Sequence, residues 1–315
     1  MLRICLGILL SILFSALAYA ETPSTHKVTR VIYITLDGTR WQDVFNDHRY
    51  FFKLKMRHAN KGIFYGEPGS NLTIETASIP MSLPSYLSQM AGYVQSCDNN
   101  ECGRIQVETV VESVAHRLGL NKKDVAVFSS WREIGLSAES VTGTAYTNVG
   151  NAPAYDPDTG QADAIMDLLN HRQAEHHSGN DRYDEYTFSQ ALHYLKKYQP
   201  RFLWISFNDA DDAAHAMDLE RYHKSLSYYD NAIDQLFTTL QKMGLDKETL
   251  VIVTTDHGRG NGIFWTSHGV LFPESKRTWA FVINGELTPI SQEGNMKHYS
   301  TLSIRPTIEA ALGII

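Results

Sequence analysis

The sequence contains little cysteine and a single long apolar run. Three cysteines occur among 315 residues, and Cys5 lies inside the apolar run at residues 4–17. One positive charge precedes this run, and the small-x-small motif AYA at residues 18–20 follows it, a pattern typical of a cleaved secretory signal peptide. A membrane anchor is disfavoured because a spanning helix needs about 18 to 20 apolar residues. We therefore predict a signal peptide at residues 1–20 and an exported protein, periplasmic or secreted, with no transmembrane segment after cleavage.

The two remaining cysteines flank a short polar loop. Cys97 and Cys102 are separated by Asp-Asn-Asn-Glu. In an exported protein, such a close pair favours a small disulfide, although two free thiols remain the alternative. A zinc site here is disfavoured because no histidine or further cysteine is grouped with the pair.

Positive charge is also scarce. The chain has 28 Lys and Arg against 35 Asp and Glu, for a formal net charge of −7. This balance disfavours a protein that binds a nucleic-acid backbone. No break in composition divides the chain, so we predict one domain over residues 21–315.

Apolar, β-branched runs alternate with helical patterns along the chain. We predict strands at residues 30–36, 124–129, 201–207, 250–255 and 278–283. We predict helices from about 82 to 91 and at 109–118, 162–174, 183–198, 219–243 and 300–312, with irregular structure at 46–75 and 141–160. This alternation is typical of an α/β fold with a mainly parallel sheet, in which ligands bind beyond the carboxyl ends of the strands.

Carboxylates and imidazoles follow three of the predicted strands. The set comprises Asp37, Asp211, His215, Asp256, His257 and, in a loop, His268. These are ligand types that borderline divalent metals prefer, and six of them suffice for two metal sites. Asp211 and His215 are four residues apart, so they share one face if this segment begins a helix.

A serine lies at a predicted helix start. Ser82 comes two residues before Pro84, and proline suits the first turn of a helix. Serine is a weak nucleophile without a base or a metal, and the chain has no Gly-x-Ser-x-Gly motif. Two metal ions would neutralise a phosphate or sulfate ester and activate the hydroxyl. Ser85 is an alternative nucleophile, but we expect it inside the helix turn.

These motifs together resemble the alkaline phosphatase superfamily, and within it the nucleotide pyrophosphatase/phosphodiesterase branch. The matching motifs are Leu-Asp37-Gly, Ser82-Leu-Pro-Ser-Tyr with Gly92 ten residues on, Asp211-x-x-x-His215, Asp256-His257-Gly and His268-Gly. The resemblance implies an alkaline-phosphatase-like three-layer sandwich, with a central mainly parallel sheet and helices on both faces.

The resemblance also implies roles for individual residues. Asp211, His215 and His268 resemble the ligands of one zinc ion, and Asp37, Asp256 and His257 resemble those of the other. Ser82 would be the nucleophile that forms a covalent phospho-enzyme intermediate. Two zinc ions are expected, with manganese as the alternative. Arg40, Arg132 and Tyr86 are hypothetical substrate contacts.

The implied activity is hydrolysis of a small-molecule phosphate ester, with phosphodiesters or nucleotide-type esters preferred. The alternatives are a phosphomonoesterase and a phosphonate or sulfate ester hydrolase. A sulfatase of this superfamily that forms formylglycine needs arginine four residues after the modified residue, where this chain has Tyr86. A non-enzymatic alternative is an exported, metal-bound binding protein.

Overall fold

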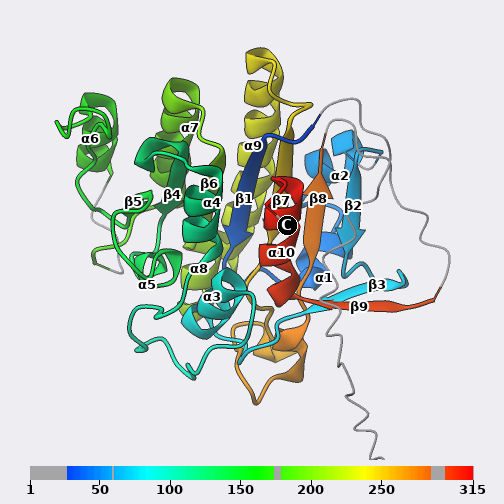
Figure 1. Ribbon diagram of the computed structural model, residues 1–315. Coiled ribbons are helices and arrows are strands. Elements are labelled where there is room, and N and C mark those ends of the chain that lie inside the picture. Colours follow the sequence, from blue (N-terminus) through cyan, green and yellow to red (C-terminus); the bar gives the residue numbers. More distant parts are fainter. Residues whose placement is uncertain (1–26, 59, 174–178, 285–294, 315) are drawn as a thin grey trace, which may run out of the picture.

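A seven-stranded sheet forms the middle of the molecule (Figure 1). The computed structural model describes residues 27–58, 60–173, 179–284 and 295–314, so the predicted signal peptide lies outside the described residues. The strand order is β2 (Gly62–Tyr65), β8 (Ala280–Ile283), β7 (Thr249–Thr254), β1 (Arg30–Leu36), β6 (Phe202–Phe207), β4 (Val125–Ser129) and β5 (Tyr146–Val149). In this sheet β8 pairs antiparallel with both neighbours and the other pairs are parallel, which confirms the predicted mainly parallel sheet.

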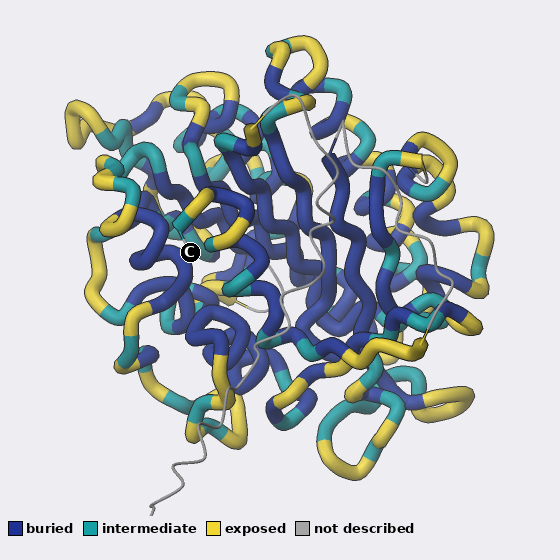
Figure 2. The backbone as a smooth tube through the Cα atoms, turned by 45° about the vertical axis from the view of Figure 1, so that its right-hand side comes forward, coloured by how far each residue is buried: buried dark blue, intermediate teal, exposed yellow. Residues whose placement is uncertain are grey.

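The central strands are buried on both faces. In β1, Ile32 and Ile34 point into one apolar core and Val31 and Tyr33 into another. Successive side chains of a strand point to opposite faces, so a strand covered on both sides has a continuous apolar sequence. Figure 2 shows these buried strands surrounded by exposed loops.

Helices cover both faces of the sheet. The first core is closed by α1 (Trp41–Phe45), α2 (Phe52–His58), α6 (Ala164–Arg172), α7 (Asp184–Tyr198), α8 (Asp209–His215) and α9 (Leu219–Met243). The second core is closed by α3 (Ser82–Ala91), α4 (Val110–Leu118), α5 (Ile134–Ala138) and α10 (Ile304–Ala311). The predicted three-layer α/β sandwich is therefore confirmed. Among the described residues, none of the helices has the length and apolarity that crossing a bilayer requires.

Two stretches that we predicted to be irregular contain regular structure. Residues 46–75 include α2, β2 and β3 (Leu72–Glu75), and residues 141–160 include β5. Each of these strands has four residues, too few for a clear alternation of apolar and polar side chains. They form because they pair with distant segments: β2 with β8, β5 with β4, and β3 with β9 (Lys297–Ser300) in a separate two-stranded sheet.

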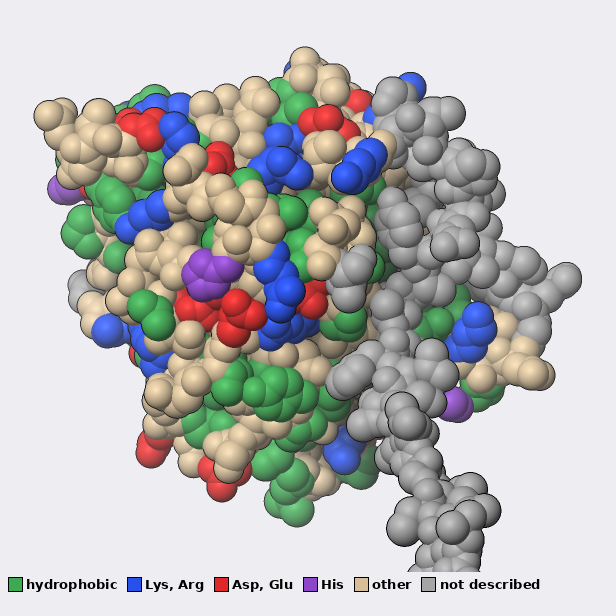
Figure 3. All heavy atoms as spheres, in the orientation of Figure 1, with side chains coloured by type: hydrophobic (Ala, Val, Ile, Leu, Met, Phe, Trp, Pro, Cys, Tyr) green, Lys and Arg blue, Asp and Glu red, His purple; other side chains and the backbone are tan. Residues whose placement is uncertain are grey.

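The order of the central strands determines where the site lies. β1 lies between β7 and β6, and all three run parallel, so their carboxyl ends meet at one edge of the sheet. The segments that follow these strands carry Asp37, Asp211 and Asp256. On the described residues of the face drawn in Figure 3, acidic and basic side chains lie interspersed, so that face offers no large patch of one charge.

Candidate metal centre

The first predicted group of ligands is Asp211, His215 and His268. Their nearest ligand atoms all lie within 4.8 Å of one another. Asp211 and His215 share one face of α8, and Nε2 of His215 lies 3.0 Å from Oδ2 of Asp211. His268 comes from the loop after β7, and its Nε2 lies 3.3 Å from Nε2 of His215. One carboxylate and two imidazoles thus converge, a donor set that suits zinc.

The second group is Asp37, Asp256 and His257, and all three residues are buried. Nε2 of His257 lies 3.7 Å from Oδ1 of Asp37 and 3.4 Å from Oδ2 of Asp256. Oδ1 of Asp256 accepts a hydrogen bond from the backbone N–H of Gly38, but Oδ2 is buried and accepts none. A buried carboxylate oxygen without a donor is costly, and a cation bound there would satisfy it. These residues therefore fit a divalent metal.

The two groups are adjacent, and Ser82 lies beside the second. The rings of His257 and His268 stack with centroids 4.2 Å apart. Ser82 is the first residue of α3, and its Oγ lies 3.2 Å from Oδ1 of Asp37 and 3.4 Å from Nε2 of His257. Ser85 instead donates to the backbone oxygen of Asp256 and is fully buried. The geometry therefore favours Ser82 over Ser85 as the nucleophile.

Burial shifts the titration of this cluster. Burial, reinforced by the charge of Asp211, raises the pKa of Asp256 to about 7. Burial likewise raises the pKa of Asp37 well above its usual range. Burial lowers the pKa of His257 to about 4 and that of His268 to about 3, so both imidazoles are neutral at pH 7. Neutral imidazole is the form that binds metal, and a bound cation would favour the ionised carboxylates.

Arg259 is a further residue of this site that was not predicted from the sequence. This arginine follows Asp256-His257-Gly directly and is fully buried. Its guanidinium donates to Oδ1 of Asp211 and to the backbone oxygen of Gly38. A charged residue in the glycine-rich stretch after a ligand pair was the available signal.

Arg40 and Arg132, two of the three predicted substrate contacts, lie in different surroundings. Arg40 donates two hydrogen bonds of 2.7 Å to the carboxylate of Asp43. Arg132 is half-exposed and lines a separate hollow of about 490 Å³, which none of the six predicted ligands lines.

Tyr86 requires a correction. Its side chain has no exposed surface, and its ring packs 5.8 Å from that of Trp204 in the second core. A substrate at the surface cannot reach this side chain, so we reassign Tyr86 from a substrate contact to a core residue beneath the site.

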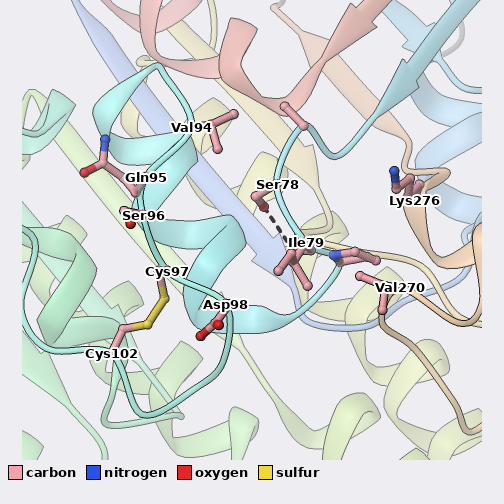
Figure 4. Close-up of a pocket in the computed structure, with 12 residues that line it drawn as sticks. Ser78, Ile79, Val94, Gln95, Ser96, Cys97, Asp98, Cys102, Val270 and Lys276 are labelled. Atoms are coloured by element: carbon pink, nitrogen blue, oxygen red, sulfur yellow. Dashed lines mark hydrogen bonds between the residues drawn. A yellow bond between two sulfur atoms is a disulfide. The ribbon is translucent and has the colours of Figure 1, made fainter.

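A cavity of about 560 Å³ lies next to the metal groups (Figure 4). None of the six ligands lines it, but Pro80 does, and the backbone oxygen of Pro80 lies 3.0 Å from Nδ1 of His268. Cys97 and Cys102 form a disulfide on one side of the cavity, and Lys276 lies on the other. The pair predicted from spacing is therefore bonded, and it forms part of a cavity wall.

Comparison with known proteins agrees with this geometry. The model of the family described as "Type I phosphodiesterase / nucleotide pyrophosphatase" matches residues 134–268, a range that contains five of the six predicted ligands. The predicted resemblance is confirmed. The match to this phosphodiesterase family supports a phosphoric ester hydrolase. No curated protein matches the sequence.

Solved structures of the alkaline phosphatase superfamily share the fold. The 2-O GAG sulfatase BT1596 matches with a TM-score of 0.61 at 12% identity, over 91% of this chain and 71% of that one. An alkaline phosphatase variant from the Antarctic bacterium TAB5, with Mg bound in its M3 site, gives 0.58 at 14%, over 91% and 99%. The lipoteichoic acid synthase LtaP from Listeria monocytogenes gives 0.57 at 12%, over 95% and 75%. At these identities the likeness shows the alkaline-phosphatase-like fold alone.

Proposed function

We propose that this protein is an exported hydrolase of phosphate esters that works with two divalent metal ions, zinc or manganese, and a Ser82 nucleophile. Phosphodiesters or nucleotide-type esters are the preferred substrates. The observation that carries this proposal is the position of Ser82. Ser82 is the first residue of α3, and its Oγ lies 3.2 Å from Oδ1 of Asp37 and 3.4 Å from Nε2 of His257. A site built only to hold metal has no need of a hydroxyl there.

The metal ions, when bound, would neutralise the ester and lower the pKa of the serine hydroxyl. Oδ1 of Asp37 accepts the hydrogen bond of Ser82 and so orients its Oγ. Attack forms an Oγ–P bond and breaks the bond from phosphorus to the leaving alcohol, which departs with a proton. Water then cleaves the Oγ–P bond, returns a proton to Oγ and releases phosphate or a phosphate monoester.

The cavity beside the site offers a place for the leaving alcohol. Pro80 lines this cavity, and its backbone oxygen also contacts Nδ1 of His268. The cavity is therefore adjacent to the Asp211 group. Its wall includes the apolar side chains of Ile79 and Val270. An ester with a bulky organic alcohol therefore fits this cavity better than inorganic pyrophosphate.

Sulfate and phosphonate esters are the second candidate class, because a sulfatase is among the proteins with a similar fold. Tyr86 lies where the superfamily's formylglycine sulfatases need arginine, and it is fully buried. A metal-bound binding protein without activity is the third candidate.

The test is hydrolysis of paired chromogenic phosphate monoesters and diesters by the purified mature protein. The assay is run after treatment with a chelator and again after zinc or manganese is added back. Turnover that returns with metal, and a higher kcat/KM for the diester, would support the proposal. Turnover of sulfate or phosphonate esters alone would favour the second class. Bound metal without any turnover would favour the binding protein, and an absence of bound metal would overturn the two-metal reading.

A further inference from the structure

Arg259 connects every segment that carries a predicted metal ligand. It follows the Asp256-His257 pair in the chain, and its Nη2 donates to Oδ1 of Asp211 in α8. Nε donates to the backbone oxygen of Gly38 at 3.1 Å, one residue after Asp37. Nη1 donates to the backbone oxygen of Thr266 at 2.5 Å, two residues before His268. One guanidinium therefore joins four segments at the edge of the sheet.

Arg259 lies among three buried carboxyl groups. Asp37, Asp211 and Asp256 each have at most 6% of their surface exposed, and Arg259 has none. Buried carboxylates that lie this close together cannot all ionise without a compensating cation.

The backbone leaves room for this guanidinium. Gly38 has φ of +59°, and a Cβ there would lie 2.9 Å from both Nε and Nη2 of Arg259 and would overlap Oδ1 of Asp211. A glycine at this position thus serves both the turn after β1 and the approach of the arginine to Asp211. The turn after β1 can therefore accommodate this contact only with glycine at position 38.

We propose that Arg259 is the internal counter-ion of the metal-free site, and that it lowers the affinity of the Asp211 group for its metal. Arg259 occupies Oδ1 of Asp211 and leaves Oδ2, which faces His215, for the ion. In the metal-free protein, Arg259 is the buried cation that offsets the Asp211 carboxylate. Once a divalent ion is bound, the ion also offsets the carboxylate charge. The stability of the folded protein then depends less on Arg259. Arg259 acts through Asp211 and is therefore a positioning residue.

The inference rests on the proposed function in one respect, that the Asp211 group binds a divalent ion. Arg259→Met is compared with Arg182→Met, because Arg182 is equally buried but donates to the neutral side chains of Asn148 and Gln190. Thermal unfolding is measured in chelator and in zinc, and zinc affinity is measured by calorimetry. A merely structural arginine would lower both melting temperatures equally when replaced.

We expect Arg259→Met to lower the melting temperature much more in chelator than in zinc, and to bind zinc at least tenfold more tightly than the unmodified chain. Linkage requires these two effects together, because an ion that binds only the folded state stabilises it. Arg182→Met should lower both melting temperatures alike and leave zinc affinity unchanged.

Arg259→Lys keeps the charge and loses the planar guanidinium. Its melting temperature in chelator and its zinc affinity should therefore lie between those of Arg259→Met and the unmodified chain. If Arg259→Met does not fold in chelator, the lysine variant supplies the comparison. Equal losses in chelator and zinc, or weaker zinc binding by Arg259→Met, would overturn the inference. If the unmodified chain binds no divalent ion at all, it is the proposed function that fails.

Discussion

The Ser82 hydroxyl donates a 3.2 Å hydrogen bond to Oδ1 of Asp37, a residue 45 positions earlier in the chain. Asp37 directly follows β1, the central strand of the sheet, and Ser82 begins α3, which packs on the second face. The contact therefore forms only when helix and sheet are packed together. It places a hydroxyl oxygen beside a buried carboxylate and a neutral imidazole, the surroundings in which a bound cation would activate it.

Replacing Ser82 with alanine removes this oxygen and little else. We expect Ser82→Ala to reduce kcat for phosphate ester hydrolysis by roughly a thousandfold or more, as is usual when a covalent nucleophile is lost. Metal content, measured by elemental analysis, should stay at the unmodified level. Ser88→Ala is the matched control, since Ser88 lies in the same helix and donates to the backbone oxygen of Pro84. Full activity in Ser82→Ala would show that another group attacks the ester.

Gly38 is the second position where a small change has a predictable result. Gly38 and Gly119 have almost the same φ, +59° and +60°, but a Cβ at Gly119 would meet nothing within 4 Å. Gly119→Ala should therefore cost only about 1 kcal/mol of folding free energy, from the left-handed backbone. Gly38→Ala carries the same cost and also pushes Arg259 away from Asp211. We expect it to lose at least tenfold in kcat, measured alongside denaturant unfolding of both variants. Equal behaviour of the two variants would contradict a steric role for Gly38.

The parts of this structure that could be predicted are those encoded by local pattern. β1, β6 and β7 were predicted because strands buried on both faces are apolar throughout. α9 was predicted at about residues 219–243 from its helical pattern and the glycine that follows, and in the structure Asp218 caps its start and Gly244 ends it in the left-handed conformation. The six predicted ligands follow from the same logic, because the carboxyl ends of parallel strands meet at one edge.

The parts that could not be predicted depend on contacts between distant segments. β5 forms because it pairs with β4, and its four residues show no period of their own. Arg259 carries no local signal of burial, and its role appears only when α8 and the turn at Gly38 surround it. Tyr86 was misassigned for the same reason. Its position in the chain lies near Ser82, but its side chain points into the core.

His58 lies outside the site, and its burial makes the stability of the protein depend on pH. Its side chain is buried against Phe237, with ring centroids 3.9 Å apart, and burial lowers its pKa to about 4. The unfolded chain keeps the ordinary value of about 6.5 and binds more protons below it. The contribution of neutral His58 to stability is thus complete above pH 6.5 and is lost as the pH falls toward 4.

We expect His58→Phe to remove this part of the pH dependence. The free energy of unfolding of the unmodified chain should fall by about 2 kcal/mol more than that of the variant between pH 6.5 and 4, given about 1.4 kcal/mol per pKa unit. Urea unfolding across this range measures the difference. Parallel curves for His58→Phe and the unmodified chain would refute the assignment.

The charge of Lys276 should influence which esters the cavity prefers. It is exposed at one side of the cavity, across from the disulfide, while Pro80 connects the cavity to His268. An ester whose leaving alcohol carries a further negative charge should contact this ammonium, whereas a neutral aryl ester should not. Because a partly solvated ion pair is worth less than about 1 kcal/mol, Lys276→Ala should raise KM for the charged ester about twofold to fivefold and leave kcat and the neutral ester unaffected.

Lys242→Ala, which replaces an exposed lysine near the end of α9, is the control. Raising the ionic strength should shrink the difference between the two esters in the unmodified chain, because salt screens exposed charges. An equal effect of Lys276→Ala on both esters would place the leaving alcohol outside this cavity.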